Sequence, residues 1–271
     1  MGKKSKMKAA WLTDIHLNFL KHNQVDDFFR KLSKEPAECF FMSGDIGEAD
    51  TVVNYLKLAD SILKRSFYFV LGNHDFYTGS FKKVWSAVSD LTKTSDNLIW
   101  LNEAGHIPLT KETALVGHDS WADGRFGDYF GSTVELNDFY YIAELKLRNK
   151  MDRLKAMKKL ADDAANHFIK VLPQALEDHQ RVIVLTHVPP FKEATWHQGK
   201  ISEDDWLPFF SCKVVGDVLR DIMEQHPSCE MTVLCGHCHS SGECQILPNL
   251  KVITGGAEYG SPKIQSIIEV K

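Results

Sequence analysis

Five short apolar runs, each followed at once by a polar side chain that can bind a metal, restrict the fold of this chain more than any other feature. Apolar runs of about four to six residues without polar alternation are typical of strands buried on both faces. The runs and the residues behind them are AAWLT before Asp14, CFFMSG before Asp45, FYFVLG before Asn73, VIVLT before His187 and TVLCG before His237. Two more strands are predicted in the tail, at 251–254 and 264–270.

Stretches with helical spacing separate these runs. One apolar stripe runs from Val25 to Leu32 and a second from Val52 to Leu63. The longest begins near residue 147, and we expect it to end near Pro173, because proline interrupts helical hydrogen bonding. The stretch S-E-D-D at Ser202 predicts a capped helix running towards residue 224. Strands alternating with helices predict an α/β fold, here in one domain over 1–271 with a helical insert at about 145–180.

The composition is that of an ordinary globular protein and gives no indication of a nucleic-acid or membrane partner. Hydrophobic residues make up 44% of the chain and charged residues 25%, which is ordinary for a globular protein. A net charge of -4 gives no indication of a nucleic-acid partner. No apolar run approaches the length of about 18 residues that spans a membrane, and the basic N-terminus lacks the apolar stretch of a signal peptide. We therefore expect a cytoplasmic protein with reduced cysteines.

The segment CGHCH at 235–239 admits several chemistries when it is considered alone. Its C-x-x-C-H spacing matches c-type haem attachment, and C-x-x-C alone matches a redox pair. Cys235, His237, Cys238 and His239 would also suit a zinc site. In a fourth interpretation the cysteines are bystanders and only the two histidines function. The local sequence leaves all four open, although the absence of an export signal weakens the haem interpretation.

Seven side chains at the predicted strand ends are candidate metal ligands. In sheets of this kind, residues beyond the carboxyl ends of the strands line the ligand crevice. Because extended chain projects alternate side chains to one side, we expect both members of D-x-H and of H-x-H to reach one site. Carboxylates and imidazoles favour Mn, Fe, Zn or Ni, and seven ligands suit two metals bridged by a carboxylate. The candidates are Asp14, His16, Asp45, Asn73, His187, His237 and His239.

With these blocks in this order, the sequence resembles the calcineurin-like metallophosphoesterase superfamily. The matching blocks are DIH at 14–16, GD at 44–45, GNHD at 72–75, His187 and GHCH at 236–239. The resemblance implies a four-layer α/β/β/α sandwich of two mixed β-sheets flanked by helices, with a dinuclear metal centre at the strand ends. It also implies a first metal on Asp14, His16 and His239, a second on Asn73, His187 and His237, and Asp45 as the bridge between them.

The resemblance further implies a reaction and two catalytic residues. A hydroxide bridging the metals would attack a phosphate ester in line, with no covalent intermediate. His74 would face the phosphate and assist the leaving oxygen, and Asp75 would orient His74. The blocks GDIGEAD and LGNHDFY look closer to the bacterial cyclic-nucleotide phosphodiesterase-like group than to protein Ser/Thr phosphatases. The alternative function is a catalytically silent scaffold with the same fold.

Two loops, at 117–130 and 194–206, are expected to shape the substrate pocket because they mix aromatic and charged side chains. Arg125 suits bidentate contacts to a phosphate. His118 and Trp196 are the other candidate substrate contacts. A solvated loop with aromatic anchors in the core is the competing interpretation of both segments.

Overall fold

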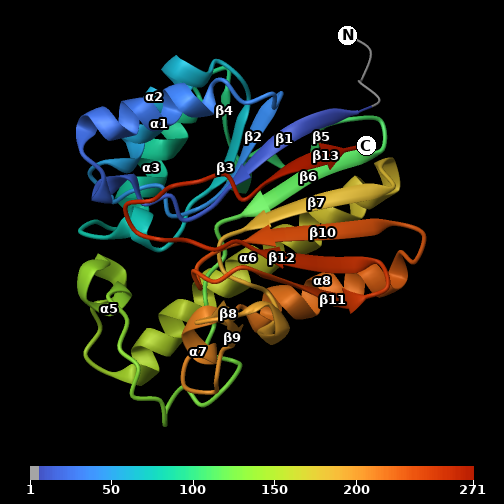
Figure 1. Cartoon of the computed structure of the whole chain (residues 1–271). Coiled ribbons are helices and arrows are strands. Elements are labelled where there is room, and N and C mark those ends of the chain that lie inside the picture. The colour runs from blue at the N-terminus through green and yellow to red at the C-terminus, as the bar shows by residue number, and fades with distance from the viewer. Residues whose placement is uncertain (1–5) are drawn as a thin grey trace.

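Two β-sheets packed face to face form the centre of the computed structural model, which describes residues 6–271 (Figure 1). The first sheet has the order β13-β1-β2-β3-β4 and the second β11-β12-β10-β7-β6-β5. Strands β13, β5 and β11 run antiparallel to their neighbours and the other pairs are parallel, so both sheets are mixed. The first sheet comprises β1 (Met7–Leu12), β2 (Cys39–Ser43), β3 (Phe67–Val70), β4 (Leu98–Trp100) and β13 (Ser266–Val270).

The second sheet and a separate small hairpin supply the remaining strands. The sheet comprises β5 (Ile107–Pro108), β6 (Thr113–His118), β7 (Arg181–Thr186), β10 (Glu230–Cys235), β11 (Gly242–Leu247) and β12 (Leu250–Thr254). The hairpin pairs β8 (Trp196–His197) with β9 (Lys200–Ile201). The strands predicted before the five polar residues and in the tail are all present, whereas β4, β5, β6 and β11 were not predicted.

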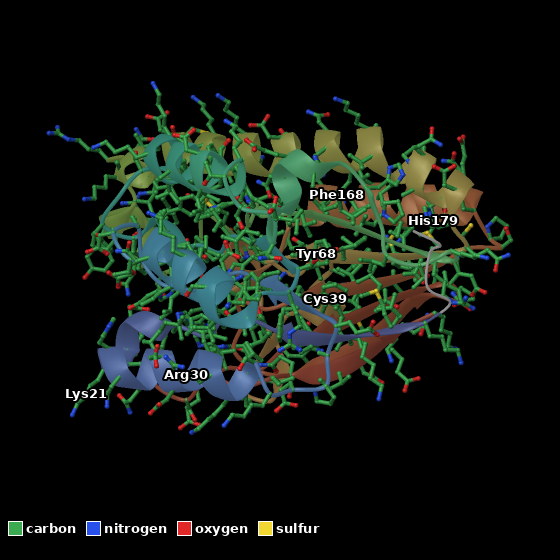
Figure 2. The ribbon with its side chains drawn as sticks, turned by 90° about the horizontal axis from the view of Figure 1, so that it is seen from above. Lys21, Arg30, Cys39, Tyr68, Phe168 and His179 are labelled. Carbon is green, nitrogen blue, oxygen red and sulfur yellow. The ribbon has the colours of Figure 1, made fainter. Side chains whose placement is uncertain are left out.

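Helices cover the outer faces of both sheets, which confirms the four-layer sandwich (Figures 1 and 2). The first sheet carries α1 (His22–Leu32), α2 (Val52–Leu63) and α3 (Phe81–Thr92). The second carries α6 (Lys150–Asp178) and α8 (Lys213–Gln225), which pack against each other. The expected insert is therefore largely α6, a covering layer of the sheet. Short helices are η1 (Leu17–Phe19), η2 (His74–Phe76), α4 (Leu101–Ala104), α5 (Asp138–Tyr141), η3 (Ala143–Leu145), η4 (Lys192–Ala194) and α7 (Leu207–Phe210).

Alternation along the strands divides the apolar side chains between two kinds of core. Trp11 of β1 lies in the core between the sheets, whereas its neighbour Leu12 belongs to the core under the helices. Cys39 and Tyr68 (Figure 2) mark the layer between the sheets. Phe168 of α6, also labelled there, belongs to the outer core. Burial on both faces explains why the strands read as continuous apolar runs.

Two helix predictions were wrong. The long helix continues through Pro173 and ends at Asp178. The apolar side chains of the last turns are buried, which favours continued helix there: Leu172, Ala175 and Leu176. The helix expected from Ser202 does not begin there, since the Ser202 hydroxyl donates to the carbonyl of Thr195 instead of capping a turn. That segment forms α7 and α8, with an interruption at residues 211–212.

Among residues 6–271, no helix is both long and apolar enough to cross a membrane. The first part of the basic N-terminal cluster, at positions 1–5, lies outside the described residues.

Candidate metal centre

The carboxyl ends of strands from both sheets meet at one edge, and all seven candidate ligands lie there. β1, β2 and β3 deliver Asp14 with His16, Asp45 and Asn73 from the first sheet, while β7 and β10 deliver His187 and His237 with His239 from the second. Backbone bonds hold the loops together, since the N–H of Asp14 donates to Gly44 and that of His16 donates to Asp45. Parallel pairing aligns these ends within each sheet, and the packing of the two sheets brings both sets together.

The ligand loops have a backbone conformation that extended strands do not have. Asp14, His16, Asp45, His237 and His239 all have positive φ, between 41° and 73°. Our expectation that D-x-H and H-x-H would be extended was therefore wrong. Each left-handed residue is disfavoured by about 1–2 kcal/mol, and such strain clusters at functional sites. The sharp turns, rather than strand alternation, bring both members of each pair to the site.

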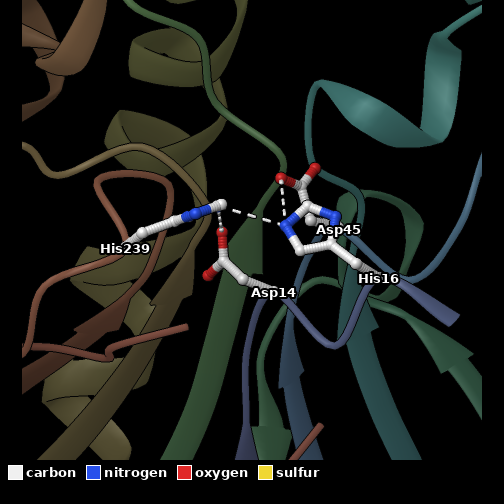
Figure 3. Close-up of side chains that lie close together, drawn as sticks. All are labelled: Asp14, His16, Asp45 and His239. Atoms are coloured by element: carbon white, nitrogen blue, oxygen red, sulfur yellow. Dashed lines mark hydrogen bonds and ion pairs between the residues drawn. The ribbon is translucent and has the colours of Figure 1, made fainter. Parts of the chain in front are cut away.

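One group of ligands consists of Asp14, His16, Asp45 and His239 (Figure 3). One ligand atom from each of the four lies within 4.8 Å of the others. The Nε2 atoms of His16 and His239 are 3.1 Å apart, and His239 Nε2 is 3.5 Å from Asp14 Oδ1. Gly236 permits this approach, because a Cβ there would lie 1.9 Å from Asp14 Oδ2. The group fits one divalent cation.

The second group, Asn73, His187 and His237, presents three electron pairs to one point. His187 Nδ1 lies 2.8 Å from the carbonyl of Ser43, and His237 Nε2 lies 3.0 Å from that of Phe209. Carbonyls only accept, so these two nitrogens carry the protons. The unprotonated His187 Nε2 and His237 Nδ1 are 3.2 Å apart, and each lies 3.0 Å from Asn73 Oδ1. Three acceptors that face one another repel, and a bound cation would remove that repulsion.

Asp45 belongs to the first group and also lies close to the second. Its Oδ2 is 3.7 Å from His16 Nε2 and 3.5 Å from His187 Nε2, while its Oδ1 accepts the backbone N–H of His74. Burial, together with the charge of Asp14, raises the pKa of Asp45 well above its ordinary value. Burial and a neighbouring carboxylate both disfavour the charged form of Asp45, and bound cations would stabilise that form. Its position therefore suits a bridge between two metal ions.

Burial favours the neutral form of three imidazoles at this edge, those of His16, His187 and His237. Burial lowers the pKa of His16 to about 3 despite the charge of Asp14. Burial and the adjacent His187 lower the pKa of His237 to about 3. Burial also lowers the pKa of His187. Metal binding requires an unprotonated nitrogen, so these side chains are ready to bind at neutral pH.

His74 lies beside the ligand groups without joining them. Its ring stacks on Tyr77 with centroids 4.2 Å apart and meets the His16 ring edge-on at 4.6 Å. We expected Asp75 to orient this ring, but Asp75 has other partners. Its Oδ1 accepts the N–H groups of Ile46 and Gly47, and its Oδ2 accepts that of Gly72. Asp75 thus ties the loop after β2 to the loop after β3.

The three candidate substrate contacts do not line the cavity at the metal ligands. Arg125 forms ion pairs with Asp123 at 3.0 Å and with Asp162 of α6 at 2.6 Å. His118 lines a different cavity, of about 430 Å³, under α3 and α6. Trp196 packs on the backbone of Gly242 in β11. None of these three side chains therefore lines the cavity at the metal ligands, although His197 of the 194–206 loop does.

A cavity of about 220 Å³ opens over the ligands, and several residues that the sequence did not single out line it, among them Tyr77, Asp138 and Tyr259. Tyr259 follows β12, which is parallel to β10, so its strand-end position could have identified it. His197, on β8, lies in the 194–206 loop that was expected to shape the pocket. Tyr77 follows η2 and Asp138 begins α5, and no pattern in the sequence connects either of them with the site.

The match to a known family agrees with this geometry. A model of the calcineurin-like phosphoesterases matches residues 7–241, so the chain belongs to the calcineurin-like phosphoesterase family. Family membership and the ligand geometry together support metal-dependent hydrolysis of a phosphate ester. No curated protein sequence gives a significant match.

Two solved structures share the fold. Phosphopantetheinyl hydrolase from Mycobacterium tuberculosis superposes with a TM-score of 0.66 at 11% identity, covering 92% of this chain and 89% of that one. A dimetal phosphatase from Danio rerio superposes with a TM-score of 0.59 at 15% identity, covering 94% of this chain and 89% of that one. At these identities the likeness establishes the fold alone.

The cysteines of CGHCH lie among apolar side chains, and we expect their replacement to spare the metals. Cys235 Sγ lies 3.4 Å from Thr254 Oγ1, and burial raises the pKa of this thiol to about 12. Cys238 Sγ contacts the carbonyl of Phe210. Cys235→Ser and Cys238→Ser should each bind as much metal per chain as wild type by elemental analysis, whereas His237→Ala and His239→Ala should each lose one ion. Metal loss from either serine variant would restore the zinc-site interpretation of the segment.

His118 should make the stability of the protein depend on pH. Burial and the neighbouring His167 lower the pKa of His118 to about 3, against 6.5 for an exposed imidazole. As pH falls from 6.5 towards 3, protons bind the unfolded state first, so stability that is complete above pH 6.5 is lost.

We expect wild type to lose about 1 kcal/mol more than His118→Asn between pH 7 and pH 5.5. Denaturant unfolding of both metal-free proteins measures the difference, and the ligand histidines cancel because both proteins contain them. Equal losses in the two proteins would contradict the prediction.

Proposed function

We propose that this protein binds two divalent transition metal ions, among Mn, Fe, Zn and Ni, and hydrolyses a phosphodiester or phosphomonoester without a covalent intermediate. The observation that supports this most is the meeting of Asn73 Oδ1, His187 Nε2 and His237 Nδ1 within 3.2 Å, while the other nitrogen of each imidazole lies against a carbonyl. The acidic group around Asp14 lies on the other side of Asp45. Nitrogen and oxygen ligands without thiolate suit these metals.

Each residue of the site has a proposed role. Asp14, His16 and His239 would hold one ion, Asn73, His187 and His237 the other, and Asp45 both. Bound ions would neutralise charge on the phosphoryl oxygens and lower the pKa of water. His74 would donate a hydrogen bond to the leaving oxygen. Asp75 would fix the distance between Asp45 and His74 through the backbone bonds of their loops.

The cavity walls favour a substrate with one phosphoryl group and an organic substituent. Among the described residues that line the cavity there is no lysine or arginine, so further phosphate charges would lack a partner. Tyr259 and Phe19 form an exposed aromatic pair at the rim, with ring centroids 4.5 Å apart. The Tyr259 ring is 4.7 Å from that of His16. This pair would contact the organic group.

A substrate panel tests the proposal. Metal-free protein would be loaded in turn with Mn, Fe, Zn and Ni and assayed on cyclic nucleotides, dinucleotides, nucleotide monophosphates and triphosphates, and aryl monoesters and diesters. We expect hydrolysis only with metal, and a higher kcat/KM for diesters than for triphosphates. Two bound ions with no hydrolysis of any ester would favour the silent scaffold instead.

A further inference from the structure

Asp138, the first residue of α5, is not itself a candidate ligand. It forms a buried hydrogen bond with Asn73, which is one. It is 4% exposed. Its Oδ1 accepts the side-chain N–H of Asn73 at 2.8 Å and the hydroxyl of Tyr77 at 2.7 Å. Asn73 Nδ2 also donates to Tyr77 Oη at 3.2 Å. The three side chains form a closed polar cluster at one end of the cavity.

The cluster decides which end of the Asn73 amide faces the other ligands. An asparagine can present either its oxygen or its NH₂ group, and only the oxygen can bind a cation. Asp138 Oδ1 offers an acceptor on one side of Asn73, which holds Nδ2 there. The oxygen is left facing His187 Nε2 and His237 Nδ1, at 3.0 Å from each. Without this acceptor, either orientation of the amide becomes accessible.

We propose that Asp138 is a positioning residue for the second metal: it orients the Asn73 amide so that Oδ1 faces the ion. The proposal rests on the proposed function, because it takes Asn73 as a metal ligand. Asp138 reaches the site from the segment between β6 and α6, whose neighbours Leu136 and Asn137 line the same cavity. The segment that forms one cavity wall therefore also determines the geometry of a ligand. Residues that hold metal ligands in this way change metal affinity by about 10–100-fold when they are replaced.

The test measures metal binding rather than turnover. Metal-free wild type, Asp138→Asn and Asp138→Ala would be titrated with Mn and with Zn by calorimetry. Asparagine keeps an oxygen acceptor for both donors, so we expect two ions with affinities within about threefold of wild type. Alanine removes the acceptor, so we expect the second ion to bind about 10–100-fold more weakly while the first is unchanged. Tyr77→Phe is the control, because it removes the Tyr77 hydroxyl from both Asp138 and Asn73 but keeps the bond between Asp138 and Asn73.

A double-mutant cycle separates positioning from a purely structural role. If Asp138 acts through Asn73, then Asp138→Ala should weaken metal binding in wild type but add nothing in an Asn73→Ala background. A structural role would weaken binding in both backgrounds and would lower the unfolding temperature of the metal-free variants equally. The proposal is overturned if Asp138→Ala binds both ions as wild type does, or if Asp138→Asn is impaired as strongly as Asp138→Ala. Absence of a second ion in wild type would instead contradict the proposed function.

Discussion

Replacing His74 with alanine is expected to leave both metals bound and to lower kcat on a diphenyl phosphate diester by about 100-fold or more. The His74 ring lies against His16 and Tyr77 at the cavity wall and is not one of the converging ligand atoms. Its N–H would assist departure of the leaving oxygen. Phenolate, with a pKa of about 10, needs that assistance, whereas p-nitrophenolate needs less because the nitro group stabilises its charge. The test measures kcat of wild type and His74→Ala on two diesters, one that releases phenolate and one that releases p-nitrophenolate. We expect the smaller loss on the second.

His197→Ala is the matched control, since His197 also lines the cavity but lies on β8, outside the ligand set. It should change kcat little for either leaving group. Full activity in His74→Ala would remove His74 from the mechanism. An equal reduction for both leaving groups would assign it to phosphate binding instead, and metal loss in the variant would make it a ligand.

Replacing Asp45 with asparagine is expected to stabilise the metal-free protein and to remove most of the stabilisation that it gains from bound metal. Burial and Asp14 raise the pKa of Asp45 far above its ordinary value. Since its unfolded pKa is lower, Asp45 destabilises the fold at every pH above the unfolded value. Removing that charge should raise stability by about 1–3 kcal/mol, and asparagine tolerates the φ of 57° at this position. Calorimetric unfolding without and with Mn or Zn measures both effects.

Metal should instead stabilise the folded state of wild type. An ion at 100 times its Kd stabilises the folded state by about 2.7 kcal/mol, and Asp45→Asn should lose most of this gain together with its phosphoesterase activity. Asp90→Asn, which changes an exposed carboxylate on α3, is the control and should behave as wild type. A metal-free Asp45→Asn protein less stable than wild type would contradict the account of Asp45, as would an undiminished response to metal.

The candidate ligands could be predicted from the sequence because their signal is local. An apolar run followed at once by Asp14, Asp45 or His187 specifies a buried strand and a polar group at its carboxyl end. Parallel pairing brings such ends to one edge within each sheet. The strand-and-helix order indicated the α/β class in the same local way. For this reason the seven candidate ligands and the α/β class follow from one sequence, whereas the four-layer sandwich and the division of the ligands into two groups came only from the family resemblance.

What only the tertiary structure decided depends on partners far apart in the chain. Arg125 has the chemistry to bind phosphate, but Asp162 of α6 lies close enough to pair with it. Asp75 stands next to His74, yet its oxygens accept backbone groups from the loop after β2. Asp138 lies in a segment without periodicity, and its contact with Asn73 joins positions 65 residues apart. Residue type and spacing determined which side chains can bind a metal, whereas packing between distant segments decided which way each one faces.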